Sequence, residues 1–324
     1  MSKKRRGKRR KLTFQYSRTP VGVFPSFGPE VLLLDSFTDA NLIEWQAHAD
    51  ALQEYHYQWY FELESQRATH QQAIRESLIA GGGGSVNLET WGRQLDVQYV
   101  THPLCSYGSL QWVGGRFNYG MDIDSSRFAP FPALYLAEDS ETAFREYFQI
   151  ERHGRAPGGL TGGELALARE RSFAWVRVEG VVHNVFDATK PTCLAAFTKV
   201  IGTFALSSRV RELEKRLALL RPLTLITTSR ELLASLMDPN WRHYPAQFNV
   251  PANSQVFGRL LVDAGFEAVL YRSTKSGKRC LALFTRQLNH SATRIKVIPP
   301  GPPGLMLAEL SSDNGALAEM PARS

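Results

Sequence analysis

The sequence predicts a mixed α/β domain that follows an N-terminal helical segment. Between residues 39 and 80, apolar side chains recur at alternating steps of three and four, which is the spacing of one helix face. From about 86 to 299, short β-like runs alternate with helix-like segments. Hydrophobic residues make up 43% and charged residues 21% of the 324 residues, as expected of a folded globular protein.

We divide the chain into five parts by composition and pattern. The first is a basic lead-in that we expect to be disordered, and the second is helical. A glycine-rich linker then precedes the α/β domain, which we expect to be catalytic, and a frayed tail closes the chain. The boundaries of these parts are 1–37, 38–80, 81–89, 90–299 and 300–324.

The basic character of the chain is confined to its start. Residues 3–11 hold eight lysines and arginines, and removing their eight charges from the net charge of +7 leaves −1. Such a block repels itself and is able to hold nucleic-acid phosphates without sequence preference. The nearly neutral remainder argues against a protein whose main task is nucleic-acid binding.

The helical segment begins near Asp39, a suitable N-cap. It is longer than a typical single helix, so we expect a break or packing against a partner. His56 lies within the apolar stripe, where a packed histidine is more common than a metal ligand. The stripe consists of Leu42, Trp45, Ala49, Leu52, His56, Trp59 and Leu63.

The glycine run at 81–85 is interpreted as a flexible link, because glycines lose much entropy in a helix. The β-like runs that follow are LDVQYV, ALYLA, FAWVRVEG, VVHNVFD, PLTLITT, AVLYRS and CLALF. The helix-like segments are 140–150, 192–220, 230–236 and 254–264. Of the β-like runs, AVLYRS and CLALF flank a turn with Ser276 and Gly277, which predicts a hairpin that has Ser273 at the end of its first strand.

Several classes of chemistry lack their motifs. The eight histidines are scattered without HExxH spacing, so we expect no metal site. No GxSxG elbow is present, and no run is long and apolar enough to span a membrane. The start has no apolar segment of a secretory signal, and three widely spaced cysteines without CxxC suit a reducing cytoplasm.

One stretch, GGRFNYGMDIDSSRFAPFPALYLAEDSETAFREYFQ, arranges groups suited to a nucleotide. Arg116 follows two glycines, and a guanidinium holds phosphate or carboxylate bidentately. Tyr135 lies in an apolar strand, where its ring is able to stack on a flat heterocycle. Asp139 or Ser140 caps the next helix, which carries Glu146 two turns in. Taken singly, these residues more often serve as a surface arginine, a core tyrosine and a solvent-facing glutamate.

The ordered set GGRFN, ALYLAEDSETAFREYF and AGFEAVLYRS resembles the RES family, over roughly residues 90–290. The family is named for an arginine, a glutamate and a serine, which by this resemblance are Arg116, Glu146 and Ser273. Tyr135 matches a tyrosine of the same pocket, and Asn118 of GGRFN is included among the substrate-binding residues. The resemblance implies an α+β fold like that of ADP-ribosyltransferase toxins, a split β-sheet core flanked by helices, here with an N-terminal helical extension.

The resemblance also implies an NAD⁺-consuming toxin of a toxin–antitoxin pair. NAD⁺ is the substrate rather than a cofactor, and the antitoxin is expected to be a separate chain. We favour hydrolysis of the nicotinamide–ribose bond over transfer of ADP-ribose to a protein acceptor. Glu146 would stabilise the cationic ribose, Arg116 would bind the pyrophosphate, Tyr135 would stack on nicotinamide and Ser273 would bind the nicotinamide-ribose end.

The chain departs from the family pattern at two places. Phe117 stands where members commonly have tryptophan, and the segment 119–132 is longer than the usual turn, so that it could form a lid over the pocket. Two other hypotheses stay open. One is a non-enzymatic binding module that uses residues 38–80 as its interface, and the other is a nucleic-acid protein that acts through residues 3–11.

Overall fold

The computed structural model describes residues 39–150, 172–219 and 222–319. The basic lead-in and the last five residues lie outside these ranges. The helices are α1 (Asp39–Thr69), α2 (Gln71–Ala80), α3 (Ser140–Phe148), α5 (Pro191–Ile201), α6 (Ser208–Leu217), α7 (Ser229–Leu236), α8 (His243–Phe248) and α9 (Asn253–Asp263). The strands are β1 (Gly84–Asp96), β2 (Leu134–Ala137), β3 (Phe173–Asp187), β4 (Ala268–Arg272), β5 (Arg279–Leu283), β6 (Arg294–Val297) and β7 (Glu309–Leu310). Short 3₁₀ turns are η3 (Val97–Tyr99), η4 (Tyr107–Leu110), η5 (Thr285–Leu288) and η6 (Gly315–Glu319).

The described strands form one mixed sheet in the order β1-β2-β5-β4-β3-β6-β7, and β1 also pairs with β3. The long strand β3 carries β1 along one edge. Its other edge is shared, because Val178 pairs with Val297 of β6 and Val185 pairs with Ala268 of β4. The sheet therefore divides at β3 into a β4–β5–β2 branch and a β6–β7 branch. This confirms the predicted α+β class with an N-terminal helical part.

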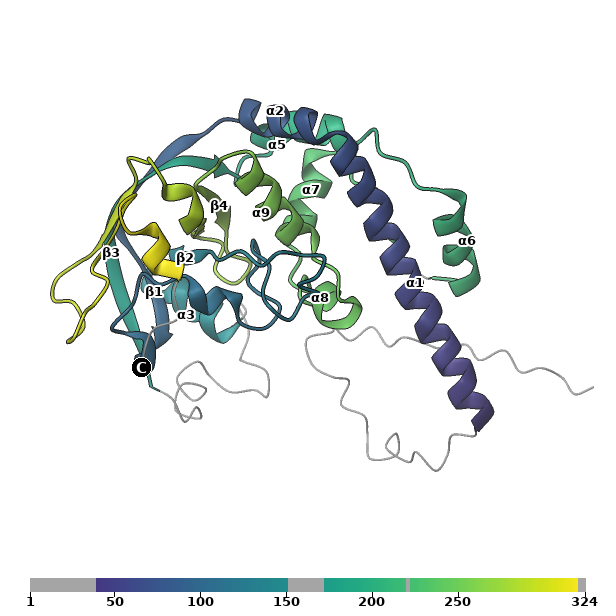
Figure 1. Cartoon of the computed structure of the whole chain (residues 1–324), viewed down its shortest axis with the longest axis horizontal. Helices are drawn as coiled ribbons and strands as arrows, with labels where there is room; N and C mark the ends of the chain where they lie inside the picture. Colours follow the sequence, from purple (N-terminus) through teal and green to yellow (C-terminus); the bar gives the residue numbers. More distant parts are fainter. Residues whose placement is uncertain (1–38, 151–171, 220–221, 320–324) are drawn as a thin grey trace, which may run out of the picture. The chain divides into compact units, whose positions relative to one another are not determined.

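The two faces of the sheet bury different cores. In β5, Cys280 and Ala282 belong to the core beneath the helices, whereas Leu281 and Leu283 belong to the core on the opposite face. This alternation follows from the two-residue period of a strand. Figure 1 shows α7, α8 and α9 between the strands and α1, so the helical layer lies on the Cys280 side.

The N-terminal helices pack on the helical layer. α1 ends at Thr69 and α2 starts at Gln71, which confirms the predicted break. His56 stacks on Phe248 of α8 with ring centroids 3.7 Å apart, so it is a packed histidine as predicted. Gln53 Nε2 donates to the carbonyl of Phe248 at 3.0 Å. The helical segment is thus continuous with the domain rather than separate from it.

The interpretation of 81–89 as a flexible linker is wrong. β1 starts at Gly84 and pairs with β3. A methyl group added at Gly81 would overlap the carbonyl oxygen of Cys193, and one added at Gly83 would overlap a side chain of β3. Gly81 and Gly83 therefore serve close packing rather than freedom of movement.

The frayed tail expected at 300–324 is also wrong over the residues described. β7 pairs with β6, where Leu310 lies opposite Ile295 and is fully buried. Ala318 is buried as well, and its carbonyl accepts a hydrogen bond of 2.7 Å from the main-chain N–H of Ser106. This part of the chain completes the core on the far face of the sheet.

The segment 119–132 is a packed part of the core rather than a lid. Ile123 and Phe131 are fully buried, and Phe128 meets Tyr60 of α1 edge-on at 5.4 Å between ring centroids. Withdrawing such aromatic groups from the core into water would cost several kcal/mol, roughly 1.5–3 for each side chain.

Three secondary-structure predictions need correction. FAWVRVEG and VVHNVFD form a single strand, β3, and the helix expected at 192–220 divides into α5 and α6. The run PLTLITT contains no strand, because side chains bind its N–H groups. Leu223 N–H donates to Tyr55 Oη at 3.0 Å, and Thr227 and Thr228 N–H donate to Glu231. The last of these contacts belongs to the capping box that starts α7.

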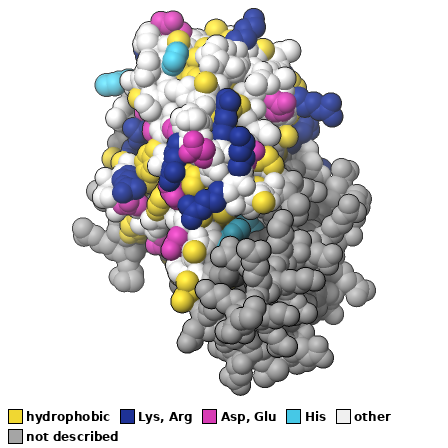
Figure 2. All heavy atoms as spheres, turned by 90° about the vertical axis from the view of Figure 1, so that its right-hand side faces the viewer, with side chains coloured by type: hydrophobic (Ala, Val, Ile, Leu, Met, Phe, Trp, Pro, Cys, Tyr) yellow, Lys and Arg dark blue, Asp and Glu magenta, His cyan; other side chains and the backbone are white. Residues whose placement is uncertain are grey.

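Among the described residues, no helix has both the length and the apolar content that a bilayer crossing requires. Figure 2 views the side of the molecule that carries α1 and α6. Outside the grey atoms, Lys and Arg side chains there alternate with Asp and Glu. This part of the surface offers no field of one sign.

Candidate functional site

The strand β2 and the helix α3 bring Glu146 to the helical side of the sheet. Asp139 caps α3, as predicted, because its Oδ1 accepts the Thr142 N–H at 2.7 Å. A carboxylate at this position also complements the helix dipole. The cap fixes where the helix starts, and Glu146 follows two turns later with its side chain partly buried.

Ser273 lies at the end of β4 and contacts Glu146 directly. Its hydroxyl donates to Glu146 Oε1 at 2.5 Å, although the two residues are 127 positions apart. Its oxygen accepts the N–H groups of Lys275 at 3.0 Å and Ser276 at 3.1 Å. Ser273 is only 3% exposed. The predicted hairpin is present, and its turn fixes the Ser273 hydroxyl against the carboxylate.

The hydroxyl of Tyr135, on β2, binds the loop that carries Arg116. The hydroxyl donates to Asn118 Oδ1 at 2.9 Å and accepts the Phe117 N–H at 2.9 Å. Burial raises the pKa of Tyr135, which Glu146 raises further and the Phe117 N–H and nearby Arg116 lower. The phenol therefore stays protonated at neutral pH.

Arg116 is buried and anchored to the end of α7. Its Nη1 donates to the carbonyl oxygens of Leu236 at 3.0 Å and Asp238 at 2.9 Å. The guanidinium lies over the Trp241 ring at 5.8 Å from its centroid. Arg116 is 9% exposed, so it is less accessible than a surface phosphate-binding arginine.

Asn118, which we expected among the substrate-binding residues, has a completely buried side chain. Its Nδ2 donates to the carbonyl of Ser109 at 2.9 Å. Its Oδ1 accepts the Gly115 N–H at 3.0 Å as well as the Tyr135 hydroxyl. Asn118 instead shapes the loop that carries Arg116.

Gln255 of α9 is a support residue that sequence reasoning missed. Its fully buried Nε2 lies 2.8 Å from the carbonyl oxygen of Val113, 3.1 Å from that of Gly115 and 2.9 Å from that of Asn118. Its Oε1 accepts the Ala252 N–H at 3.1 Å, which fixes the orientation of the amide. The Gln255 side chain thus stabilises the turn that contains GGRFN.

Arg242, just before α8, is the second missed residue. Its guanidinium lies over the Trp241 ring at 4.5 Å from the centroid, and its Nη1 lies 3.3 Å from Gln149 Oε1. The residue is exposed overall. Partial removal of the guanidinium from water and the charge of Arg116 lower the pKa of Arg242, whereas Glu146 raises it. Arg242 therefore belongs to the same electrostatic group.

We use the name Glu146 group for Glu146, Ser273, Tyr135, Arg116 and Arg242. This group provides a carboxylate, an aromatic ring and two guanidinium groups on one side of the sheet. That set is able to bind an anionic nucleotide and to stabilise a cation that develops beside the carboxylate. Within the ranges described, histidines, cysteines and carboxylates do not gather in threes where a metal ion could be held.

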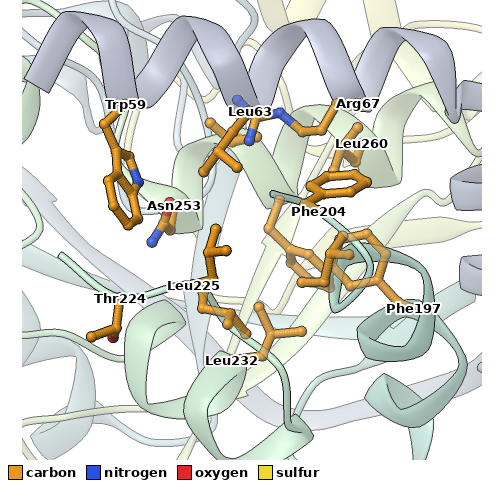
Figure 3. A pocket seen from close by; sticks show the side chains of 14 residues that line it. Trp59, Leu63, Arg67, Phe197, Phe204, Thr224, Leu225, Leu232, Asn253 and Leu260 are labelled. Atoms are coloured by element: carbon orange, nitrogen blue, oxygen red, sulfur yellow. The ribbon is translucent and has the colours of Figure 1, made fainter. Parts of the chain in front are cut away.

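A separate cavity of about 70 Å³ lies on the other side of α9. In Figure 3, Trp59 and Leu63 point from α1 into the cavity, which Leu225 and Phe204 also line, and Arg67 extends along the helix toward Leu63. The lining is mainly apolar and contains neither Glu146 nor Ser273, so the cavity is distinct from the Glu146 group. α9 serves both, since Val256 and Leu260 line the cavity, whereas Gln255 and Gly258 face the Arg116 loop.

Comparison with protein families gives one match, to the RES domain, over residues 197–302. The resemblance inferred from the sequence is confirmed by this match. Ser273, Arg242 and Gln255 lie inside the matched residues, whereas Arg116 and Glu146 precede them.

No curated protein matches the chain. A chain of the M. tuberculosis MbcT–MbcA toxin–antitoxin complex superposes with a TM-score of 0.40 and 14% identity, covering 76% of this chain and 97% of that one. At such a TM-score the likeness supports no argument about function, so the reading of the site rests on the RES match and on its own geometry.

The serine of the RES resemblance lies in direct contact with the glutamate, and the tyrosine hydroxyl binds the main chain directly after the arginine. Three short motifs that are far apart in sequence therefore converge in space. Arg116 belongs to the same group, but its Nη1 is bound to main-chain carbonyls.

Proposed function

We propose that the protein cleaves the nicotinamide–ribose bond of NAD⁺ by hydrolysis, with Glu146 at the reacting centre. The observation that carries the proposal is the hydrogen bond of 2.5 Å from the Ser273 hydroxyl to the Glu146 carboxylate. It holds one carboxylate in a fixed orientation at the edge of a partly buried site. The RES match over 197–302 supports the same reading.

The reaction needs charge stabilisation more than proton transfer. As the bond from the ribose carbon to the nicotinamide nitrogen breaks, its electron pair leaves with nicotinamide, which becomes neutral. The ribose becomes oxocarbenium-like, and water then bonds to the carbon and loses a proton to solvent. A carboxylate beside the ribose stabilises the cation, and its second oxygen is suited to hold a ribose hydroxyl.

The neighbouring side chains would place the substrate. The Tyr135 ring would stack on nicotinamide, and its hydroxyl is held in place by Asn118 and the Phe117 N–H. Arg116 and its neighbours would attract the pyrophosphate. In the ligand-free site, Ser273 acts through Glu146, since its single hydrogen is donated to the carboxylate. We therefore assign Ser273 a positioning role, which revises its predicted direct contact with the substrate.

Transfer of ADP-ribose to a protein acceptor is the second candidate, because the same cation is trapped by a nucleophile other than water. We further propose that the protein acts as a toxin in the cytoplasm, restrained by a separate antitoxin chain. The odd cysteine count supports that compartment. The binding-module hypothesis is less favoured, since α1 and α2 pack on the domain instead of standing apart. Nucleic-acid contact through residues 3–11 concerns a segment outside the described ranges.

The deciding experiment measures NAD⁺, nicotinamide and ADP-ribose over time with purified protein. Glu146→Gln keeps the shape and loses the charge, so it should abolish most turnover. Glu141→Gln is the matched control, because Glu141 lies on the same helix and pairs at the surface with Arg145. Hydrolysis through Glu146 would be established if wild type and Glu141→Gln release equal amounts of nicotinamide and ADP-ribose, and Glu146→Gln releases neither.

Other outcomes separate the alternatives. Nicotinamide release that appears only with a protein acceptor, with ADP-ribose attached to that acceptor, would indicate transfer. Undiminished NAD⁺ turnover by Glu146→Gln would overturn the role assigned to Glu146. A toxic effect that survives Glu146→Gln without any NAD⁺ loss would favour the binding module.

A further inference from the structure

We propose that Arg242 and Arg116, which both lie over the Trp241 ring, form an anion subsite that binds the diphosphate of the substrate, with Arg242 as its exposed contact. The proposal rests on the proposed function and deepens it, because it places the diphosphate end of the dinucleotide. Both guanidinium groups lie over the same ring, at 5.8 Å for Arg116 and 4.5 Å for Arg242. Two segments far apart in sequence thus bring two cations together.

The two arginines are unequal in what they offer a ligand. Arg116 is 9% exposed, and its Nη1 is committed to the main-chain carbonyls of Leu236, which ends α7, and of Asp238. Arg242 is exposed, and its hydrogen bond to Gln149 Oε1 is long, at 3.3 Å. A planar guanidinium with N–H groups left for a ligand is well suited to bidentate phosphate binding. Arg116 therefore shapes the subsite and adds charge, whereas Arg242 makes the contact.

The local charge balance also calls for an anion. Among the described residues, no ion pair joins Arg116 or Arg242 to a carboxylate. Glu146 is the acidic group that acts on Arg242, and Ser273 already holds its Oε1. Two like charges beside one carboxylate repel each other, and the charge of Arg116 lowers the pKa of Arg242. A diphosphate would relieve that repulsion.

Both guanidinium groups lie over the Trp241 ring. Trp241 itself is only 2% exposed. Cations over an indole face are attracted by the ring quadrupole. The ring therefore preorganises Arg242, and less side-chain entropy is lost when a phosphate binds.

The test compares ADP with adenosine by calorimetric titration, since the two ligands differ by the diphosphate. Arg242→Gln should weaken ADP binding about tenfold or more, because hydrogen bonds to charged groups are strong. Adenosine binding and the melting temperature should not change. Arg242→Lys should restore part of the ADP affinity, because it keeps the charge but not the fork. Arg230→Gln, at an exposed position on α7, is the matched control and should bind like wild type.

Arg116→Gln separates the two roles. It should lower the melting temperature, because two main-chain carbonyls lose their donor, and it should weaken ADP as well. Unchanged ADP affinity in Arg242→Gln would overturn the subsite, as would an equal loss for adenosine or wild-type protein that binds neither ligand.

Parallel NAD⁺ kinetics keep this proposal distinct from the proposed function. A wild type that cleaves NAD⁺ and an Arg242→Gln variant with unchanged KM and kcat would overturn the subsite and leave the function standing. Wild-type protein that binds ADP through Arg242 without cleaving NAD⁺ would support the subsite and overturn the function. A raised KM at constant kcat in Arg242→Gln would support both.

Discussion

The hydroxyl of Ser273 and the carboxylate of Glu146 lie 2.5 Å apart in a hydrogen bond that links the β4–β5 turn to α3. The turn supplies two N–H groups to the serine oxygen, so the hydroxyl cannot rotate freely. The orientation of Glu146 thus depends on the local geometry of a hairpin turn.

Replacing Ser273 by alanine should lower kcat with little change in KM. The carboxylate loses a hydrogen bond worth about 1.5–3 kcal/mol, which corresponds to roughly a tenfold to hundredfold effect. Steady-state NAD⁺ kinetics check this. Thr274→Val is the control, because the neighbouring Thr274 hydroxyl is buried without a hydrogen-bond partner. Equal kinetics for Ser273→Ala and wild type would contradict the positioning role.

Replacing Gln255 by glutamate should destabilise the fold and disorder the Arg116 loop. A carboxylate has no N–H to offer the three carbonyl oxygens and would place a negative charge among them. We expect a loss of about 3 kcal/mol in the free energy of unfolding. Urea denaturation checks this, with the exposed Gln247→Glu on α8 as the control. Similar midpoints for both variants would show that the loop does not depend on Gln255.

Replacing Gly258 by alanine should also destabilise the protein, although alanine normally favours a helix. The added methyl would overlap the main-chain oxygen of Phe117, so α9 and the Arg116 loop must separate. Gly108→Ala is the control, since a methyl there meets no atom within 4 Å. Thermal denaturation should show a clear drop for Gly258→Ala alone. A stabilised Gly258→Ala would mean that the helix and the loop are not in contact.

Acid should destabilise the protein partly through His56. Burial lowers the pKa of His56 from 6.5 to about 4, so the folded state disfavours the protonated ring. Stability is therefore complete above pH 6.5 and falls as the pH drops toward 4, because the unfolded state binds the proton first. Urea denaturation at several pH values should show a weaker dependence for His56→Phe. The exposed His48→Gln on the same helix should follow wild type.

Some features of the candidate site can be predicted from the sequence. Glu146 and Ser273 were found through short motifs, and the Asp139 cap and the hairpin turn follow local rules. The prediction that Glu146 and Ser273 lie together depended on the family resemblance, because no local pattern connects residues 127 positions apart.

Other residues gave no sequence signal. Gln255 and Arg242 are single polar residues in an ordinary helix and a loop, and their roles arise from tertiary contacts such as that of Gln255 with Val113, 142 positions away. Asn118 shows the reverse, since its place in a motif suggested ligand contact although burial gives it a structural role. The glycine run at 81–84 suggests flexibility by composition, but two of its members, Gly81 and Gly83, pack closely against neighbouring atoms.

The hydrogen bonds of the Ser273 hydroxyl form a chain from donor to acceptor that leads to Glu146. Two main-chain N–H groups point at its oxygen, its own hydrogen points at Glu146, and the sequence of donors ends on the carboxylate. Glu146 is an acceptor on both oxygens when it is ionised. A ligand that meets this carboxylate must therefore arrive with a hydrogen to give. A sugar hydroxyl satisfies that polarity, whereas an ether or a ketone in the same place would find two oxygens facing it and no partner.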